Sequence, residues 1–441
     1  MKTEQNKFCV AAKNRRFFSV YIKTFGCSAN RSDSEVMAGL LIQAGYKIVN
    51  SAKDADLVVI NSCGVKGRAE IDFFREVEAA RKLKKKIIAC GCIPSGNKET
   101  VETKLRGISI VDVNSIHKIA FVAEKTLAGE RIVLFGKNKI EKICLPRQRL
   151  NKVVAIVPIS EGCVGSCAYC FTKLAKGGLF SYSETAILKE IKNAIADGCK
   201  EIWLTSQDCA AYGLDTNTNL AKLLEKACNI PGDFHIRVGM GNPNHILKIL
   251  PELINAYKNK KVFKFLHIPV QSGNNRVLKL MNRFYTVEDF KEIVKKFRPE
   301  IKDLTLITDI ICGFPTETDK EFSDSIDLIK WLQPDAINVS MFWPRPGTIA
   351  EKMKQLSGEI KKKRSREMTK LYHSIALDVN KKYIGNKFKV LIDEIGKKGG
   401  FVARNESYKP VVLKDSKLKL GDSLNVKIIN ATKNYLIGVL L

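Results

Sequence analysis

The chain has 441 residues, of which 45% are hydrophobic and 27% are charged. This length predicts about three domains with sizeable cores. The net charge of +28 favours a polyanionic partner such as nucleic acid. No run approaches the roughly 18 apolar residues of a membrane span, and the apolar patch at 8–11 is too short for a secretory signal. We therefore expect a cytoplasmic protein with no membrane partner, in which thirteen cysteines favour metal or redox clusters over disulfides.

Residues 17–130 alternate short apolar segments with amphipathic helical stretches, which predicts a doubly wound parallel α/β domain. One cysteine follows each of three predicted strands: Cys27, Cys63 and Cys92. The carboxyl ends of parallel strands meet at one edge of a sheet, so we expect the three thiolates to converge. The alternative is three loop cysteines without a shared task. Residues 131–150 lack periodicity and are interpreted as a linker. The predicted strands are 17–23, 56–61 and 86–90.

A second group of cysteines, Cys163, Cys167 and Cys170, lies between an apolar run and a helical stretch. No fourth Cys or His lies nearby, whereas a structural zinc site has four protein ligands. Three thiolates in one tight loop suit a four-iron cluster that keeps one iron open. An open iron can chelate a small molecule through an amine and a carboxylate.

Strand and helix patterns repeat about six times after residue 151, within a predicted domain of residues 151–378. This repeat predicts a central partial (β/α)6 TIM-like barrel with the Cys163 loop at its mouth, and a doubly wound sheet is the alternative. Polar residues at other strand ends are candidates for binding a nucleoside cofactor. The predicted strands are 153–159, 201–205, 235–239, 262–268, 304–311 and 336–342. The candidate cofactor-binding residues are Gln207, Asn242, Gln271, Ser272 and Gly313.

From residue 381 to 441 the hydrophobic period changes to two, and five short strands predict a small C-terminal β-barrel of the oligonucleotide-binding type. This segment has 13 Lys and Arg against 5 Asp and Glu. Basic and aromatic side chains occur together, as on a single-strand RNA platform. The alternative is a solubilising β-cap whose aromatic residues form its core. The candidate RNA-binding residues are Phe401, Arg404, Tyr408 and Lys409.

Taken together, these motifs make the chain resemble the tRNA methylthiotransferases over nearly its whole length, and more specifically their archaeal and eukaryotic branch. The C-x3-C-x2-C spacing resembles that of the radical S-adenosylmethionine enzymes, and the C-terminal segment resembles a TRAM domain. The motifs are Phe25-Gly-Cys27-Ser-Ala-Asn30, Asn61-Ser-Cys63-Gly-Val, Gly91-Cys92-Ile-Pro, Ala175-Lys-Gly-Gly-Leu-Phe-Ser-Tyr182, Arg237-Val-Gly-Met-Gly-Asn-Pro243 and Pro344-Arg345-Pro-Gly-Thr348.

The resemblance implies an enzyme that places a methylthio group on C2 of N6-threonylcarbamoyladenosine, just 3′ of the anticodon of tRNA. It implies two [4Fe-4S] clusters, one on each cysteine group, and S-adenosyl-L-methionine as both methyl donor and radical source. Within the matching motifs, Tyr169 is a candidate for the cofactor site and Arg345 for contact with the tRNA anticodon loop. An electron donor such as ferredoxin or flavodoxin and a sulfur source are implied as partners.

Three other functions stay open from the sequence. The same chemistry on isopentenyladenosine or on a ribosomal-protein aspartate is the nearest, and the basic C-terminal segment disfavours the protein target. A non-catalytic iron–sulfur RNA-binding protein is the second, and it would not cleave S-adenosylmethionine. A zinc-dependent structural RNA-binding protein is the third, and metal analysis would identify it.

Overall fold

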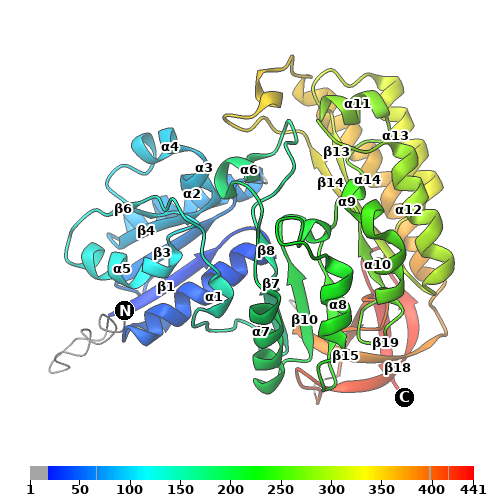
Figure 1. Cartoon of the computed structure of the whole chain (residues 1–441), viewed down its shortest axis with the longest axis horizontal. Helices are drawn as coiled ribbons and strands as arrows, with labels where there is room; N and C mark the ends of the chain where they lie inside the picture. The colour runs from blue at the N-terminus through cyan, green and yellow to red at the C-terminus, as the bar shows by residue number, and fades with distance from the viewer. Residues whose placement is uncertain (1–17, 66, 397–398, 416) are drawn as a thin grey trace.

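The computed structural model describes residues 18–65, 67–396, 399–415 and 417–441. An N-terminal sheet, a larger central barrel and a small C-terminal β-barrel succeed one another along the chain (Figure 1). The short apolar patch at 8–11 lies outside the described residues. Within the described ranges, no helix is long and apolar enough to cross a membrane.

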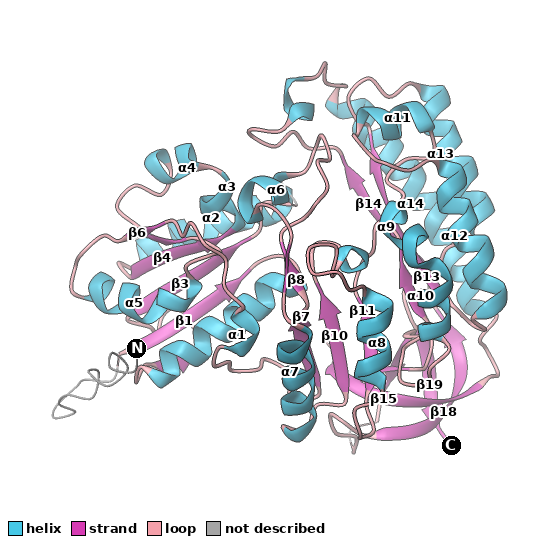
Figure 2. Cartoon of the chain, in the orientation of Figure 1, coloured by secondary structure: helices cyan, strands magenta, loops and turns pink. Residues whose placement is uncertain are grey.

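The N-terminal sheet has six parallel strands in the order β2-β1-β3-β4-β5-β6, with helices on both faces (Figure 2). This confirms the doubly wound parallel fold expected for this part of the chain. The strands are β1 (Ser19–Thr24), β2 (Lys47–Val49), β3 (Leu57–Ser62), β4 (Lys86–Gly91), β5 (Ser109–Val111) and β6 (Val133–Leu134). The helices are α1 (Ser28–Gln43), α2 (Gly67–Lys82), α3 (Cys92–Gly96), α4 (Lys98–Thr103) and α5 (Ile119–Leu127).

The central strand β3 is apolar along most of its length because helices cover both faces of the sheet. Leu57 and Val59 pack in the core shared with α1 and α5, while Val58 and Ile60 pack in the core shared with α2. The segment interpreted as an unstructured linker differs from that prediction, because its strand β6 pairs with β5 at the sheet edge. A two-residue strand is too short to show periodicity in the sequence.

The central part is an open barrel of six parallel strands. One three-stranded sheet has the order β11-β10-β7 and the other has the order β12-β13-β14. A single bridge between Ile236 and Val262 joins them. In the described residues no pairing closes β14 onto β7, so the predicted partial barrel is confirmed. The strands are β7 (Val154–Pro158), β10 (Glu201–Thr205), β11 (His235–Val238), β12 (Phe265–His267), β13 (Thr305–Cys312) and β14 (Ala336–Met341).

Helices cover the outside of this barrel. Alternate strand residues such as Ile202 and Leu204 pack in the core beneath the helices, and the residue between them, Trp203, points into the lumen. A two-stranded ribbon, β8 (Ser160–Glu161) with β9 (Phe180–Ser181), flanks the cysteine loop. The helices are α6 (Phe171–Lys176), α7 (Glu184–Ala196), α8 (Leu220–Cys228), α9 (Pro243–Ile246), α10 (Leu250–Tyr257), α11 (Asn275–Leu280), α12 (Val287–Glu300), α13 (Asp319–Leu332) and α14 (Gly358–Lys381).

The C-terminal segment forms a closed five-stranded barrel in the order β15-β16-β17-β19-β18, as expected. It packs beneath the starts of the central strands, at the end opposite the Cys163 loop (Figure 1). The Tyr408 hydroxyl donates to Glu201, the first residue of β10, at 2.8 Å, and the Tyr408 ring contacts Phe265, the first residue of β12. The strands are β15 (Lys387–Ile395), β16 (Phe401–Arg404), β17 (Pro410–Leu413), β18 (Ser423–Ala431) and β19 (Leu436–Leu440).

Candidate active site

The Cys163 loop runs from β8 to α6, and neighbouring loops fix its backbone. The Ala168 amide donates to the Met281 carbonyl at 2.9 Å, and the Ala350 amide donates to the Ala168 carbonyl at 2.8 Å. The Gly162 amide donates to the Gln207 side-chain oxygen at 2.6 Å. The loops after β10 and β14 and the end of helix α11 therefore set the shape of the cysteine loop.

The three thiols of this loop lie around a small space. A Cβ built on Gly165 would lie 3.3 Å from the Cys163 sulfur and 3.8 Å from the Cys167 sulfur, so glycine leaves the space between them open. Burial raises the pKa of the Cys163 thiol to about 11 and also raises that of Cys170. These thiols need a positively charged metal centre to become thiolates, which fits an iron–sulfur cluster.

A buried polar network reaches the same loop from two other loops. An Arg283 Nη atom lies 3.0 Å from the Cys167 sulfur, and the other Nη donates to the Asn242 side-chain oxygen. Asn242 Nδ2 donates to Asp208 Oδ2 at 2.6 Å, and His245 Nδ1 lies 2.6 Å from the same oxygen. The sequence singled out Asn242 but missed Arg283, because Arg283 follows helix α11 and not a barrel strand.

The structure also brings together the other three cysteines. The Asn30 Oδ1 atom lies 3.9 Å from the sulfurs of both Cys27 and Cys92. A Cβ on Gly26 would lie 2.8 Å from the Cys63 sulfur. Burial raises the pKa of the Cys92 thiol to about 12, so this thiol is expected to ionise only on binding a metal centre. Three thiols brought together in this way fit a cluster as those of the Cys163 loop do.

The two cysteine groups are neighbours in space. Phe171, the residue after Cys170, packs with Cys92 in one buried cluster. Its ring fills the space in front of Gly64 and Gly96, where a Cβ would come within 2.3 and 2.6 Å of ring carbons. Helix α6 therefore carries the end of one cysteine loop directly onto the loops that hold the other.

A buried cluster of four charges joins the same two regions: Lys142, Lys176, Asp33 and Glu161. Both lysines bind Glu161 Oε1, at 2.7 Å from Lys142 and 2.8 Å from Lys176. The lysines also lie 3.3 and 3.5 Å from the Asp33 carboxylate on α1. Burial acts to raise the pKa of Glu161, but the two lysines lower it to about 2. The cluster had no signal in the sequence, because Lys142 lies in the presumed linker.

Across the described ranges, no three His, Cys, Asp or Glu side chains are arranged as ligands of one metal ion. A cubane cluster asks for a different arrangement, because each cysteine thiolate binds its own iron. Two thiolates on one zinc, with Zn–S bonds of about 2.3 Å, must lie closer together than thiolates on separate irons.

The predicted cofactor-binding residues are distributed over the barrel. Tyr169 is part of the cysteine loop, and its half-buried ring packs edge-on against Phe314. Gln271 has a left-handed backbone (φ 69°) and bridges to β13, and Ser272 is buried one residue later. Gly313 lies under helix α14, where a Cβ would come within 2.6 Å of the Lys361 side chain. Gln207 and Asn242 therefore lie nearest the cysteine loop, which contains Tyr169.

Four of the residues predicted to contact RNA have other partners. Arg345 is only 4% exposed and binds Glu70 at 2.5 Å and the Val65 carbonyl at 2.8 Å. Tyr408 is buried at the base of the central barrel, Lys409 binds Asp335 at 2.6 Å, and Arg404 binds Asp393 at 3.0 Å. The Arg404 pair lies within the small barrel, and the other three side chains connect parts of the protein to one another. The assignment of these four residues as RNA contacts stays a prediction. Phe401 packs partly buried against the core of the small barrel.

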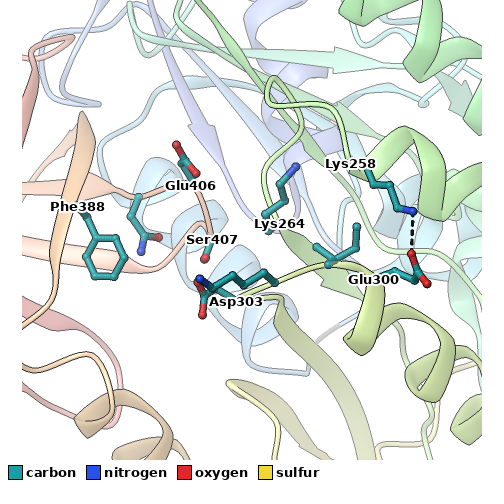
Figure 3. Close-up of a pocket in the computed structure, with 10 residues that line it drawn as sticks. Lys258, Lys264, Glu300, Asp303, Phe388, Glu406 and Ser407 are labelled. Carbon is teal, nitrogen blue, oxygen red and sulfur yellow. Dashed lines mark ion pairs between the residues drawn. The ribbon is translucent and has the colours of Figure 1, made fainter.

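A cavity of about 400 Å³ also lies at this lower junction (Figure 3). Lys258, Lys264, Glu300 and Asp303 line it from the central barrel, and Phe388 and Glu406 line it from the C-terminal barrel. The Lys258–Glu300 ion pair of 2.7 Å spans one side. This cavity lies between the central barrel and the small barrel, and no cysteine lines it.

Three family models match the chain, and solved structures share its fold. The models are the Radical SAM superfamily at residues 157–329, Uncharacterized protein family UPF0004 at residues 19–111, and the TRAM domain at residues 381–441. The radical S-adenosylmethionine methyltransferase TsrM from Kitasatospora setae, with cobalamin and a [4Fe-4S] cluster, has a TM-score of 0.58 at 13% identity, covering 76% of this chain and 74% of that chain. At this identity the likeness concerns the fold alone.

Curated relatives match nearly the whole chain. A "Probable threonylcarbamoyladenosine tRNA methylthiotransferase" of Pyrococcus horikoshii is 45% identical over 96% of this chain and 99% of the relative. A relative with the same name in Archaeoglobus fulgidus is 41% identical, and the match covers 96% of this chain and 98% of the relative. The "Threonylcarbamoyladenosine tRNA methylthiotransferase" of Homo sapiens is 38% identical over 95% of this chain and 73% of the relative. The chain therefore belongs to the family of threonylcarbamoyladenosine tRNA methylthiotransferases.

Proposed function

We propose that this protein methylthiolates C2 of N6-threonylcarbamoyladenosine in tRNA, next to the anticodon. The observation that carries the proposal is the meeting of two three-cysteine groups at one barrel mouth, joined by Phe171 and the buried charge cluster. The names of the archaeal and human relatives support the substrate. We divide the chain into three domains, each with one task. Residues 17–130 would hold the Cys27, Cys63 and Cys92 group, residues 151–378 the Cys163 loop, and residues 381–441 would bind RNA.

Carbon C2 of adenine bears a hydrogen that acid–base chemistry cannot easily remove, so the reaction needs a cofactor. Two [4Fe-4S] clusters and S-adenosyl-L-methionine would supply a carbon-centred radical, a methyl group and a bound sulfur. Cys163, Cys167 and Cys170 would hold the first cluster, and Cys27, Cys63 and Cys92 the second. Gln207, Asn242 and Tyr169, the last within the cysteine loop, are the proposed contacts for S-adenosylmethionine. Gln271, Ser272 and Gly313 have weaker support from their positions.

The chain's own residues hold these two groups in place. Arg283 and the Gln207 side chain fix the Cys163 loop through the Cys167 sulfur and the Gly162 amide. Lys176 ties that loop to α1, which begins immediately after Cys27. We infer that this fixed spacing lets sulfur bound at one group reach a carbon activated at the other.

The RNA-binding face of the small barrel is also part of the proposal. Lys387 and Lys427 are exposed and stand directly opposite each other on the antiparallel strands β15 and β18. Like charges in that arrangement are destabilising unless an anion lies between them. Lys389 extends the same outer face. This face fits the phosphate backbone of tRNA better than the half-buried Arg404 or the buried Tyr408 and Lys409 do.

The proposal includes further partners and a location. Each radical requires an electron, so a low-potential donor such as ferredoxin or flavodoxin is expected, together with a sulfur source. A cytoplasmic location fits a tRNA substrate. Isopentenyladenosine is the second candidate substrate, and the relatives named for the threonylcarbamoyl nucleoside make it the weaker one.

Nucleoside mass spectrometry tests this function. The chain is expressed in cells that make N6-threonylcarbamoyladenosine but lack its methylthio form, and total tRNA is digested. We expect the methylthio nucleoside with the wild-type chain and none with Cys167→Ala. Cys228→Ala, a buried cysteine on α8 outside both groups, is the matched control and should retain the product. Methylthiolation only of isopentenyladenosine would overturn the substrate assignment.

A further inference from the structure

The lumen of the central barrel holds an arginine that aromatic rings fix in place. The guanidinium of Arg237, on β11, lies 5.2 Å from the ring centroid of Trp203, 4.7 Å from that of Phe265 and 5.5 Å from that of Tyr408. Rings stacked on a planar cation hold it without using its N–H donors. The three rings therefore hold the Arg237 guanidinium at this place in the lumen.

The protein itself does not use those donors. The buried Nε of Arg237 has no hydrogen-bond partner, and within the described ranges no carboxylate pairs with its guanidinium. Glu201 accepts from the Trp203 indole and the Tyr408 hydroxyl through its Oε1, and it makes no ion pair with Arg237. The Arg237 side chain is half-buried, and a buried donor such as its Nε is costly to leave without a partner. Arg237 is therefore suited to an anionic ligand.

A second arginine reaches the same place from the N-terminal domain. Arg31 lies on the first turn of α1, and its guanidinium is 5.7 Å from the Trp203 ring. The contact of 2.6 Å between the Ser28 and Thr205 hydroxyls places the start of α1 at the end of β10. The Glu35 carboxylate is near enough to feel the charge of Arg31, but its Oε1 accepts from the Leu150 amide.

The remaining wall of the lumen is polar and already hydrogen-bonded. Asp309 Oδ1 lies 3.0 Å from His267 Nε2 and accepts from Asn338 at 2.6 Å. These three residues come from the neighbouring strands β12, β13 and β14. The only lumen acid in this wall is thus held by its neighbours, within the part of the chain that the structure describes. Within the described residues, the lumen charge without an ion-pair partner is therefore that of Arg237 on β11.

We propose that Arg237, assisted by Arg31, binds the carboxylate of the threonylcarbamoyl group of the substrate. This inference rests on the proposed function and deepens it. The threonylcarbamoyl side chain ends in a carboxylate, whereas an isopentenyl side chain carries no charge. Arginine binds a carboxylate through two parallel N–H donors. A site with such buried donors rejects an analogue that leaves them unpaired. Arg237 is therefore a specificity-determining residue of the site.

The test measures binding of three anticodon stem-loop RNAs to the cluster-loaded protein with S-adenosylmethionine. One RNA carries N6-threonylcarbamoyladenosine, one carries its methyl ester, and one carries unmodified adenosine. We expect the wild type to bind the carboxylate form about ten- to a hundredfold more tightly than the ester, as for a charged hydrogen bond. Arg237→Gln should bring this ratio close to one while the affinity for the ester stays unchanged.

Two further variants keep the result interpretable. Arg237→Lys retains the charge and should keep part of the preference, and the exposed Lys260→Gln should keep all of it. Reductive cleavage of S-adenosylmethionine by Arg237→Gln at the wild-type rate shows that the variant is folded and loaded. An unchanged ratio in Arg237→Gln would overturn the inference, as would a wild type that binds acid and ester equally. The same wild-type preparation is also assayed for methylthiolation of the RNA that carries N6-threonylcarbamoyladenosine. If it forms the product while either contradicting result is seen, the role of Arg237 is wrong and the proposed function still holds.

Discussion

The two ends of the central barrel each bury a glutamate, and the two carboxyls behave in opposite ways. At the mouth, Lys142 and Lys176 bind Glu161 and lower its pKa to about 2 despite its burial. At the base, burial raises the pKa of Glu201 to about 7, and the nearby Asp393 adds to the rise. Hydrogen bonds from Trp203 and Tyr408 offset only part of that shift.

This difference shows how each end is held together. The mouth joins two cysteine groups through charges that are matched when Glu161 is ionised. The base joins the central barrel to the small barrel through aromatic contacts around a carboxyl that is partly protonated near neutral pH. The mouth is therefore most stable when its acid is charged, and the base when its acid is neutral.

The largest effect on this comparison is expected from Lys176→Met. It removes one of two cations and leaves Glu161 and Asp33 buried with Lys142 alone. Breaking a buried ion network in this way costs about 3–5 kcal/mol. Urea unfolding followed by circular dichroism measures the loss, with the exposed Lys189→Met on α7 as control. Equal midpoints for the two variants would show that the cluster does not hold the mouth.

The second prediction concerns pH at the base. The pKa of Glu201 is higher in the folded chain than its ordinary value of 4.5, so its contribution to stability is greatest below pH 4.5 and is lost as the pH rises through 7. The shift corresponds to about 3 kcal/mol. Glu201→Gln should remove this loss, measured as the unfolding midpoint at pH 5 and pH 8. The pH dependence of stability at the mouth has the opposite sign. The ionised Glu161 stabilises the folded chain above pH 4.5, and this contribution is lost as the pH falls toward 2.

A pH dependence that Glu201→Gln leaves unchanged would contradict the assignment of the base carboxyl. Glu225→Gln on the surface helix α8 is the control, because this exposed carboxyl should not alter the dependence.

The smallest of the three effects is expected from Gly64→Ala. The added methyl group would meet the Phe171 ring at 2.3 Å, so the ring must move away from the loop that follows Cys63. Overpacking of this kind costs about 1–3 kcal/mol. Gly358→Ala, which meets no neighbouring atom, is the matched control. Differential scanning calorimetry compares the two, and a Gly64→Ala chain as stable as the control would mean that Phe171 does not fix the two cysteine groups.

Much of the architecture was predictable because strand patterns in a parallel barrel are strong. Strand β10 has the predicted bounds, 201–205, and the segment 381–441 forms the five short strands that were predicted for it. Both cysteine groups were predictable from strand-end positions and spacing. Strand β12 is shorter than predicted, because residues 262–264 form only a bridge with β11 before β12 begins.

The missed features share a physical reason. Tyr408 and Lys409 have the composition of an RNA platform, but composition does not tell which side of a small barrel faces another domain. Lys176 and Arg283 act through partners far away in the sequence, Asp33 and Asn242, and only the folded chain brings them together. The lumen position of Arg237 follows from strand alternation, but its missing partner does not.

The most direct test of the account compares two products of one reaction with the Cys63→Ala variant. The purified, reconstituted chain is incubated with dithionite, S-adenosylmethionine and tRNA containing N6-threonylcarbamoyladenosine, and 5′-deoxyadenosine and the methylthio nucleoside are measured together. Separate tasks for the two cysteine groups predict that 5′-deoxyadenosine still forms and that the methylthio nucleoside does not. Methylthio nucleoside formed by Cys63→Ala at the wild-type level would contradict the central claim.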